Sequence, residues 1–401
     1  MHYINRPEYT NKIRPFIGKQ IIKVIVGQRR VGKSYLLYQL MDTIKAENPL
    51  ANILYINREL EEFIYLRTHL DLMEYLKDKL PENSQNYLFI DEIQEIESFQ
   101  LALRSLLAEN NCDIFCTGSN AKILSGELAT YLSGRYIEFT IHSLSYAEFL
   151  EFHHLANSSE SLMKYLTFGG MPYLANIGLE ENLPFEYLRN VYSTILLKDV
   201  VSRENIRNVS FLENLVMYLA DNVGNLFSAA NISRFLKSQH VDISPQLTIN
   251  YLKALSNAFF IYKVVRSEVG GLKIFEIGEK YYFEDLGLRN AIRGFNRMTD
   301  MQKLLENAVF LHLIEIGYRV YVGKIGSNEI DFVVDKNGEK IYIQVALQLR
   351  EKATVEREFG NLLMIKDNYP KYVVTIDDFI IGQDYRGIKQ INLRDFLLLD
   401  V

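Results

Sequence analysis

One eight-residue motif constrains the fold of this chain more than any other feature. It fits the pattern G-x-x-x-x-G-K-[ST] and consists of Gly27, Gln28, Arg29, Arg30, Val31, Gly32, Lys33 and Ser34. The β-branched run 21–26 predicts a buried strand before the motif, and residues 35–41 predict a helix after it. A loop between strand and helix directs backbone N–H groups and the helix dipole at one point, which favours a bound polyphosphate.

Individual residues of this loop have predictable roles. Lys33 is expected to reach the β- and γ-phosphates, and the Ser34 hydroxyl is expected to bind Mg²⁺. Gly27 and Gly32 allow backbone turns that a Cβ would obstruct. The alternative is a chance glycine-rich turn, which the flanking strand and helix disfavour. We therefore predict that residues 27–34 bind a nucleotide.

A second predicted strand ends in two acidic residues. Asp91 and Glu92 follow the apolar residues 87–90, which is the pattern of a Walker B strand. Ligands of parallel sheets bind at the carboxyl ends of the strands. Asp91 is therefore expected to hold Mg²⁺, and Glu92 is expected to orient and polarise the attacking water. The alternative is a strand that ends in a solvated acidic turn.

Two further segments supply candidate catalytic residues. Residues 113–120 predict a strand beside Walker B, so that Ser119 or Asn120 would hydrogen-bond the γ-phosphate or the water. A strand-terminal turn is the alternative for both residues. Residues 134–139 predict the last core strand, and Arg135 at its start is a candidate arginine finger that stabilises transition-state charge. A surface salt bridge is the alternative for Arg135.

These motifs resemble those of a group of predicted prokaryotic AAA+-type ATPases. The resemblance covers nearly the whole chain, and the residues that carry it are Gly27–Ser34, Asp91-Glu92, 117–119, 134–136, 168–172, 197–200 and 280–289. It implies ATP as the nucleotide. It also implies an ATPase core over 1–141, a helical lid over 142–204, a winged helix over 205–294 and a domain similar to PD-(D/E)XK nucleases over 295–401. The motifs after residue 141 identify the family without assigning chemistry to it.

Composition narrows the class of protein and its partners. A length of 401 residues suggests about two to four domains. A net charge of −6 argues against general nucleic-acid binding, so a basic patch would have to be local. The only cysteines, Cys112 and Cys116, exclude a disulfide framework and favour reduced thiols in the cytoplasm. The N-terminus lacks the apolar stretch of a signal peptide, and no apolar run is long enough to span a membrane.

The region 205–294 has the pattern of a winged helix. Three helical segments precede a hairpin that turns at Gly270-Gly271. The third helix opens at Ser244-Pro245, and its predicted apolar stripe is Leu247, Ile249, Leu252 and Leu255. Its candidates for base contacts are Gln246, Thr248, Asn250 and Lys253. The range 203–294 holds 11 basic and 9 acidic residues, which is a weak electrostatic signal, and a protein partner is the alternative to DNA or RNA.

The C-terminal region predicts a helix over 301–316 and then strands that flank an Asn337-Gly338 hairpin turn. In the PD-(D/E)XK resemblance, Glu306 lies on this helix and Asp331 takes the place of the metal-binding Asp. A nuclease site also needs a second carboxylate and a lysine two residues on. This chain has Gln344 and Ala346 at those positions, so we expect that nuclease activity is lost.

The sequence thus predicts an α/β fold, with a P-loop parallel sheet and flanking helices, then a helical and winged-helix region and a small α/β nuclease-like domain. The predicted function is a Mg²⁺-dependent ATPase that acts as a switch or remodelling device. The partner would be DNA, RNA or a protein, without a membrane, and the chain is a candidate homo-oligomer. A nucleotide-gated binding module with slow hydrolysis and an ATP-gated nuclease are the alternatives.

Overall fold

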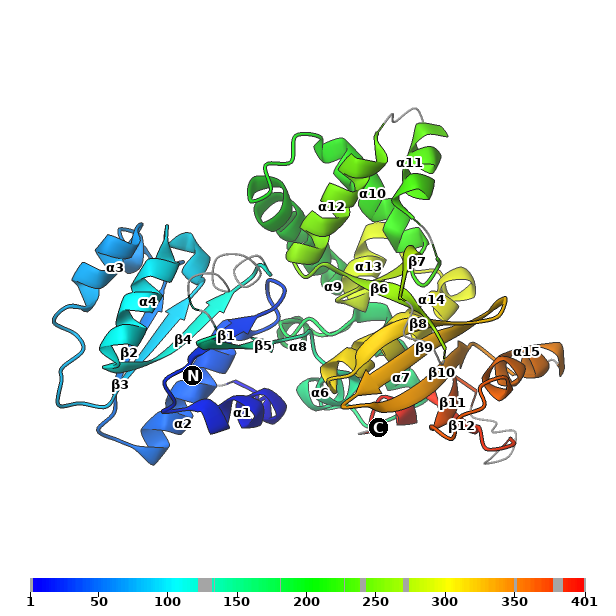
Figure 1. Ribbon diagram of the computed structural model, residues 1–401, viewed down its shortest axis with the longest axis horizontal. Helices are drawn as coiled ribbons and strands as arrows, with labels where there is room; N and C mark the ends of the chain where they lie inside the picture. The colour runs from blue at the N-terminus through cyan, green and yellow to red at the C-terminus, as the bar shows by residue number, and fades with distance from the viewer. Residues whose placement is uncertain are drawn as a thin grey trace. The chain divides into compact units, whose positions relative to one another are not determined.

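A computed structural model describes residues 3–121, 132, 134–180, 182–226, 228–238, 243–269, 274–349, 352–377 and 385–399. The chain forms two compact units. The first comprises Met1–His142 together with Asn257–Phe259, and the second comprises Ser143–Ser256 and Phe260–Val401. Figure 1 shows the elements of each unit.

A parallel five-stranded sheet in the order β2-β3-β4-β1-β5 is the centre of the first unit. Its strands are β1 (Ile22–Val26), β2 (Asn52–Asn57), β3 (Asn86–Asp91), β4 (Cys112–Gly118) and β5 (Tyr136–Thr140). The helices of this unit are α1 (Pro7–Ile13), α2 (Lys33–Glu47), α3 (His69–Leu76) and α4 (Phe99–Glu109), with short 3₁₀ turns η1 (Arg14–Phe16), η2 (Glu61–Phe63) and η3 (Ile93–Glu95).

The apolar strands of this sheet are buried because helices cover both of its faces. Figure 1 shows α1 and α2 on one side of the sheet, and α3 and α4 on the other. Every residue of β1 and β3 is buried, as expected for parallel strands between two helical layers. All five strands end at the same edge, where the loop after β1 leads into α2. The predicted P-loop sheet is therefore confirmed.

The second unit contains a group of helices, most of which precede its strands in the chain. They are α6 (Tyr146–Phe152), α7 (Ser159–Phe168), α8 (Leu174–Ile177), α9 (Leu183–Thr194), the π-helical stretch η5 (Ile195–Ser202), α10 (Val209–Asp221), α11 (Ala229–Ser238), α12 (Pro245–Asn257, whose last residue counts with the first unit) and α13 (Leu286–Arg293). The predicted helical character of residues 142–200 is confirmed.

The loop after α7 packs tightly, because a Cβ at Gly170 would lie 2.3 Å from the carbonyl oxygen of Leu144.

The third predicted helix of the winged-helix region has a different buried face from the one expected. Thr248 is fully buried in α12 and donates to the carbonyl oxygen of Ser244, so it is not available for a base contact. Ile249 is 46% exposed, although the predicted apolar stripe included it. The inward face carries Tyr251, Leu252 and Leu255. The stripe was therefore wrong at Ile249, because packing against neighbouring helices set the phase of the helix.

A seven-stranded mixed sheet in the order β12-β11-β10-β9-β8-β6-β7 completes the second unit. Its strands are β6 (Ile261–Glu268), β7 (Ile274–Phe283), β8 (Arg319–Ile325), β9 (Asn328–Lys336), β10 (Glu339–Ala346), β11 (Lys371–Thr375) and β12 (Lys389–Asn392). Helices α14 (Arg297–Glu315) and α15 (Lys352–Leu363) pack against β10, and α16 (Leu393–Phe396) follows β12.

The predicted wing hairpin forms, but it belongs to this larger sheet. Strands β6 and β7 pair antiparallel, and β6 also pairs in parallel with β8 through Arg266 and Val322. The predicted turn residues Gly270 and Gly271 lie outside the described residues. The predicted domain limits at residues 204 and 294 stay predictions, since one compact unit contains the helices, the hairpin and the C-terminal strands.

The predicted C-terminal hairpin is confirmed at its turn. Asn337 and Gly338 both have positive φ, of 56° and 90°, as a two-residue type I′ turn between β9 and β10 requires. Strand β12 and helix α16 were not predicted. In the part of the chain that the structure describes, no helix is both long and apolar enough to cross a membrane.

Candidate active site

The loop between β1 and α2 adopts a compact backbone path. A Cβ at Gly27, where φ is 149°, would lie 2.1 Å from the carbonyl oxygen of Ile141, so only glycine fits this position. The Lys33 side chain is 5% exposed and folds back over the loop. Its Nζ donates to the carbonyl oxygens of Gly27 at 3.0 Å and Gln28 at 2.9 Å. These contacts fix the ammonium group beside the loop.

The first turn of α2 suits an anion. Its N-cap is Gly32, a left-handed residue with φ of 97°, and no described side chain caps the helix. Helix N-termini leave several backbone N–H groups without helical partners, and the dipole adds positive potential there. Gln28 is fully buried, and its side-chain amide has no hydrogen-bond partner among the described residues. Uncapped N–H groups, a buried amide and a lysine together fit a polyphosphate.

Asp91 lies at the carboxyl end of β3, next to the loop. It is 2% exposed, and its carboxylate accepts hydrogen bonds from the hydroxyls of Ser34, Thr117 and Tyr55, the last at 3.0 Å. Burial raises the pKa of Asp91, while the bonds from Ser34 and Thr117 act against that rise. The structure thus joins Ser34 and Asp91, the two predicted Mg²⁺ ligands. A carboxylate beside a hydroxyl is a donor set that fits this hard cation.

Glu92 follows Asp91 in a left-handed backbone conformation with φ of 55°. Its N–H donates to the Thr117 hydroxyl at 2.9 Å. Its Oε2 accepts from the Ser119 hydroxyl at 3.0 Å and from the Gln94 amide, and its Oε1 lies 4.0 Å from Lys33 Nζ. Because Ser119 and Gln94 hold one carboxylate oxygen, the other oxygen faces the lysine of the loop.

The predicted residues after β4 reach the same edge. Ser119 is fully buried, and its hydroxyl contacts Glu92. Asn120 is 5% exposed. The next residue, Ala121, donates its N–H to the carbonyl oxygen of Asn257 at 2.8 Å within the first unit. Five side chains of the predicted site therefore gather at one edge of the sheet: Lys33, Ser34, Asp91, Glu92 and Ser119.

Arg135 lies at the opposite end of the strands, immediately before β5 begins. Its carbonyl oxygen accepts from the N–H of Ile22, at the start of β1, and its side chain is exposed. Strands β1 and β5 are parallel, and Val26 next to the loop pairs with Thr140. Five residues of strand separate the two ends of the sheet by about 16 Å. Arg135 therefore does not reach the loop of its own chain, and a role across a subunit boundary stays a prediction.

Four residues at this edge were not among the predicted site residues. Tyr55 and Thr117 bind Asp91, and Gln94 binds Glu92. Arg6 is 4% exposed and donates to the carbonyl oxygen of Val31 within the loop at 2.9 Å. Thr117 lies near the end of a predicted strand, so its position in the sequence could have indicated that it belongs to the site. No sequence motif marks Arg6, which reaches the loop only through the fold.

The C-terminal residues of the nuclease-like pattern also come together. Glu306 on α14 and Asp331 on β9 both contact the buried side chain of Lys280 from β7. Burial raises the pKa of Asp331 and the charge of Glu306 adds to the effect, while the charge of Lys280 acts against it. Gln344 accepts from the backbone N–H of Asp331 at 2.7 Å. Among the residues described, no group of three or more His, Cys, Asp or Glu side chains is arranged to hold a metal ion.

Comparisons with known proteins place the chain in a family. It is 37% identical to an uncharacterized protein of Haemophilus influenzae over 401 residues, which cover 98% of both chains. It is 32% identical to an uncharacterized protein of Methanocaldococcus jannaschii over 378 residues, covering 89% of this chain and 82% of the other. The chain belongs to the family of these two proteins. A domain of unknown function, DUF8612, matches residues 159–299.

The first unit has a more specific match. An AAA domain matches residues 19–150, a range that contains the loop, Asp91 and Glu92. The fold is similar to that of a Walker-type ATPase of Pyrococcus abyssi, with a TM-score of 0.51 and 17% identity over 72% of this chain and 96% of that chain. The AAA match supports a P-loop ATPase of the AAA type, and the likeness to the solved structure agrees with it in fold. The winged-helix and nuclease-like interpretations of the second unit stay predictions.

Proposed function

We propose that this protein binds ATP with Mg²⁺ and hydrolyses it, and that it uses the nucleotide cycle as a switch or remodelling device. The observation that carries the proposal is the meeting of Lys33, Ser34, Asp91 and Glu92 at the carboxyl edge of one parallel sheet. Edges of this kind are where such sheets bind ligands. The AAA match over residues 19–150 supports the same class of activity.

Each side chain of the site has a separate role. Lys33 and the N–H groups of the α2 N-terminus bind phosphate oxygens, and Ser34 and Asp91 hold Mg²⁺, which neutralises phosphate charge when bound. Glu92 orients the attacking water and accepts its proton. Ser119 and Gln94 position Glu92 through its Oε2. Asn120, buried beside Ser119, is the remaining candidate for a contact with the γ-phosphate or the water.

Steady-state hydrolysis of Mg²⁺-ATP by the full chain tests the proposal. We expect turnover that requires Mg²⁺ and that changes when single-stranded DNA, double-stranded DNA or RNA is added, if a nucleic acid is the partner. Tight ATP binding with little turnover would instead favour a nucleotide-gated binding module. ATP that neither binds nor turns over would contradict the assignment of the site.

Helix α12 is the proposed surface for a nucleic-acid partner. Gln246, Asn250 and Lys253 are exposed on it, and each can reach base edges or phosphates. The charge of the region is nearly balanced, so a protein partner stays an alternative. A binding titration against salt separates the two, because loss of affinity with rising salt measures the number of phosphate contacts.

Arg135→Ala is expected to lower kcat by about 10-fold or more and to leave ATP affinity nearly unchanged, if Arg135 acts on the nucleotide of a neighbouring subunit. The physical reason is that an arginine finger stabilises charge in the transition state, not in the ground state. The measurement is kcat and KM of the purified variant. Arg14→Ala is a control, because Arg14 is exposed and pairs with Glu47 in the same unit.

A mixing experiment separates action across subunits from any other role. Arg135→Ala chains keep Glu92, and Glu92→Gln chains keep Arg135. If the two residues meet across a boundary, mixing the two inactive variants restores part of the activity. If mixing restores none while Arg135→Ala alone is impaired, Arg135 does not act across subunits.

The full chain is expected to show no metal-dependent cleavage of DNA or RNA. Gln344 supplies no charge for a metal ion, and Ala346 supplies no cation beside the scissile phosphate. The assay uses supercoiled, linear and single-stranded substrates in Mg²⁺ and in Mn²⁺, with and without ATP. Cleavage that disappears in Asp331→Asn protein would contradict this expectation and support an ATP-gated nuclease.

A further inference from the structure

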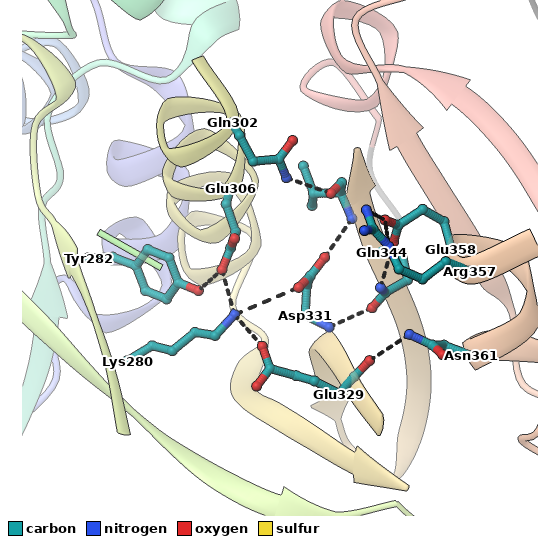
Figure 2. Close-up of polar contacts among 11 residues, drawn as sticks. Lys280, Tyr282, Gln302, Glu306, Glu329, Asp331, Gln344, Arg357, Glu358 and Asn361 are labelled. Atoms are coloured by element: carbon teal, nitrogen blue, oxygen red, sulfur yellow. Dashed lines mark hydrogen bonds and ion pairs between the residues drawn. The ribbon is translucent and has the colours of Figure 1, made fainter. Parts of the chain in front are cut away.

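A buried cation lies at the centre of the nuclease-like part of the second unit. Lys280, on the hairpin strand β7, is 2% exposed. Figure 2 shows its ammonium group between three carboxylates. Its Nζ lies 2.8 Å from Glu306 Oε1, 2.8 Å from Glu329 Oε1 and 3.7 Å from Asp331 Oδ1. Three elements far apart in sequence thus supply one ion cluster: β7, α14 and β9.

We propose that Lys280 is the resident cation of this carboxylate cluster and that its ammonium group excludes a divalent metal ion from it. An ammonium group has three donors and no acceptor, which matches three surrounding carboxylates. A buried carboxylate needs a paired cation or hydrogen bonds. Burial by itself would lower the pKa of Lys280, but the charges of Glu306, Asp331 and Glu329 outweigh it, and the pKa rises. The three carboxylate contacts of its Nζ hold the lysine in its charged form.

Other contacts of the cluster are consistent with a permanent site. The Tyr282 hydroxyl, two residues along β7 from Lys280, donates to Glu306 Oε1 at 2.5 Å. The backbone N–H of Val345 donates to Asp331 Oδ2 at 2.8 Å. The turn at Gly224 closes over Glu306, since a Cβ there would lie 2.9 Å from the carboxyl group. Glu306 is therefore held in place beside Lys280.

Gln344, the neutral residue at the second carboxylate position, fits this arrangement. Its amide bridges two groups, because Oε1 accepts from Asp331 N at 2.7 Å and Nε2 donates to Glu358 Oε2 at 2.8 Å. Glu358, 5% exposed, also accepts from Arg357. A glutamate at position 344 would lose the donor and place a second negative charge against Glu358. The amide is thus matched to its partner on α15.

Ala346 fits the arrangement as well. It is 4% exposed and belongs to an apolar cluster with Leu349, Phe359 and Leu362. A lysine at position 346 would have to leave this cluster or bury its charge in it, which is costly. Position 346 therefore supplies no cation to the carboxylate cluster, and Lys280 supplies one from another strand. Gln344 and Ala346 are therefore both compatible with a cluster whose cation is Lys280.

The first test measures whether Lys280 stabilises the cluster. In the full chain, Lys280→Met is expected to lower the melting temperature by about 10 °C, because a buried charge pair is broken and the carboxylates stay. Lys263→Met is the matched control on β6, since Lys263 is 48% exposed and pairs with Glu279 at 3.1 Å. Adding Glu306→Gln to Lys280→Met should recover part of the loss, because it removes one uncompensated charge.

The second test measures metal binding directly, without nucleotide and in an Asp91→Asn background that weakens the ATP-site metal. Free Mn²⁺ is counted by electron paramagnetic resonance. Chains with Lys280 should bind no Mn²⁺ that depends on Asp331, whereas Lys280→Met chains should bind one additional ion per chain. That ion should disappear when Asp331→Asn is added.

Three outcomes would overturn the proposal. The first is Mn²⁺ that binds with Lys280 present and is lost in Asp331→Asn chains. The second is a folded Lys280→Met chain that gains no ion. The third is a Lys280→Met chain that melts like the unmodified protein. If Lys280→Met does not fold, the stability of Lys280→Met/Glu306→Gln and the Mn²⁺ count in chains that keep Lys280 decide the question.

Discussion

Replacing Glu92 by glutamine is expected to lower kcat for ATP hydrolysis by about 10²-fold or more, with ATP affinity close to that of the unmodified protein. Glutamine has the size of glutamate but cannot accept a proton from water. Both Ser119 and Gln94 donate to the same oxygen, Oε2, so the single amide oxygen of glutamine can take its place. The variant should therefore keep its local geometry and lose only the base.

The matched control for this variant is Glu97→Gln. Glu97 is an exposed carboxylate five positions along the chain, so the charge change is the same and the site is left intact. Single-turnover and steady-state hydrolysis separate binding from chemistry in both variants. A Glu92→Gln chain that hydrolyses ATP at a rate near that of the control would remove Glu92 from the catalytic role.

Replacing Lys33 by alanine is expected to weaken ATP binding by about 100-fold or more. The ammonium group would otherwise make charge-assisted hydrogen bonds to two phosphates, and two such bonds are worth about 3 kcal/mol or more in total. In this structure Lys33 Nζ donates to the carbonyl oxygens of Gly27 and Gln28 and lies 4.0 Å from Glu92. Alanine removes the positive charge that offsets Glu92 beside the phosphates.

Calorimetric titration with ATP and Mg²⁺ measures this loss. Lys45→Ala is the control, because Lys45 lies in the last turn of the same helix and is exposed. The melting temperature without nucleotide shows whether the Lys33→Ala chain is folded. A folded Lys33→Ala chain that binds ATP as well as the control contradicts the assignment of residues 27–34 as the nucleotide site.

Local sequence pattern was sufficient for most of the elements. The apolar runs that end at Val26 and Ile90 became the buried strands β1 and β3, because helices cover both faces of a parallel sheet. The Asn337-Gly338 turn followed from the two positive φ angles that only such residues adopt easily. These features depend on neighbours within a few residues, so the sequence alone predicts them.

The buried face of helix α12 was predicted less well. Periodicity placed Ile249 on the inward face of α12, but it is exposed and Thr248 is buried. Apolar residues on both sides of a helix make two phases almost equally good by sequence. Packing against the rest of the unit selects one of them, and so removes Thr248 from the candidates for base contact while Asn250 and Lys253 stay exposed.

The sequence by itself determined the P-loop, the Walker B pair and the residues proposed to bind phosphate and metal, because a short motif with its flanking strand and helix specifies them. Only the tertiary structure decided which residues meet across long separations. Strand register put Arg135 at the edge away from the loop, and pairing of β6 with β8 joined the hairpin to the C-terminal sheet. The same pairing carried Lys280 to Glu306 and Asp331, a contact without a local signal. Such contacts form because burying charge requires a partner from wherever the chain supplies one.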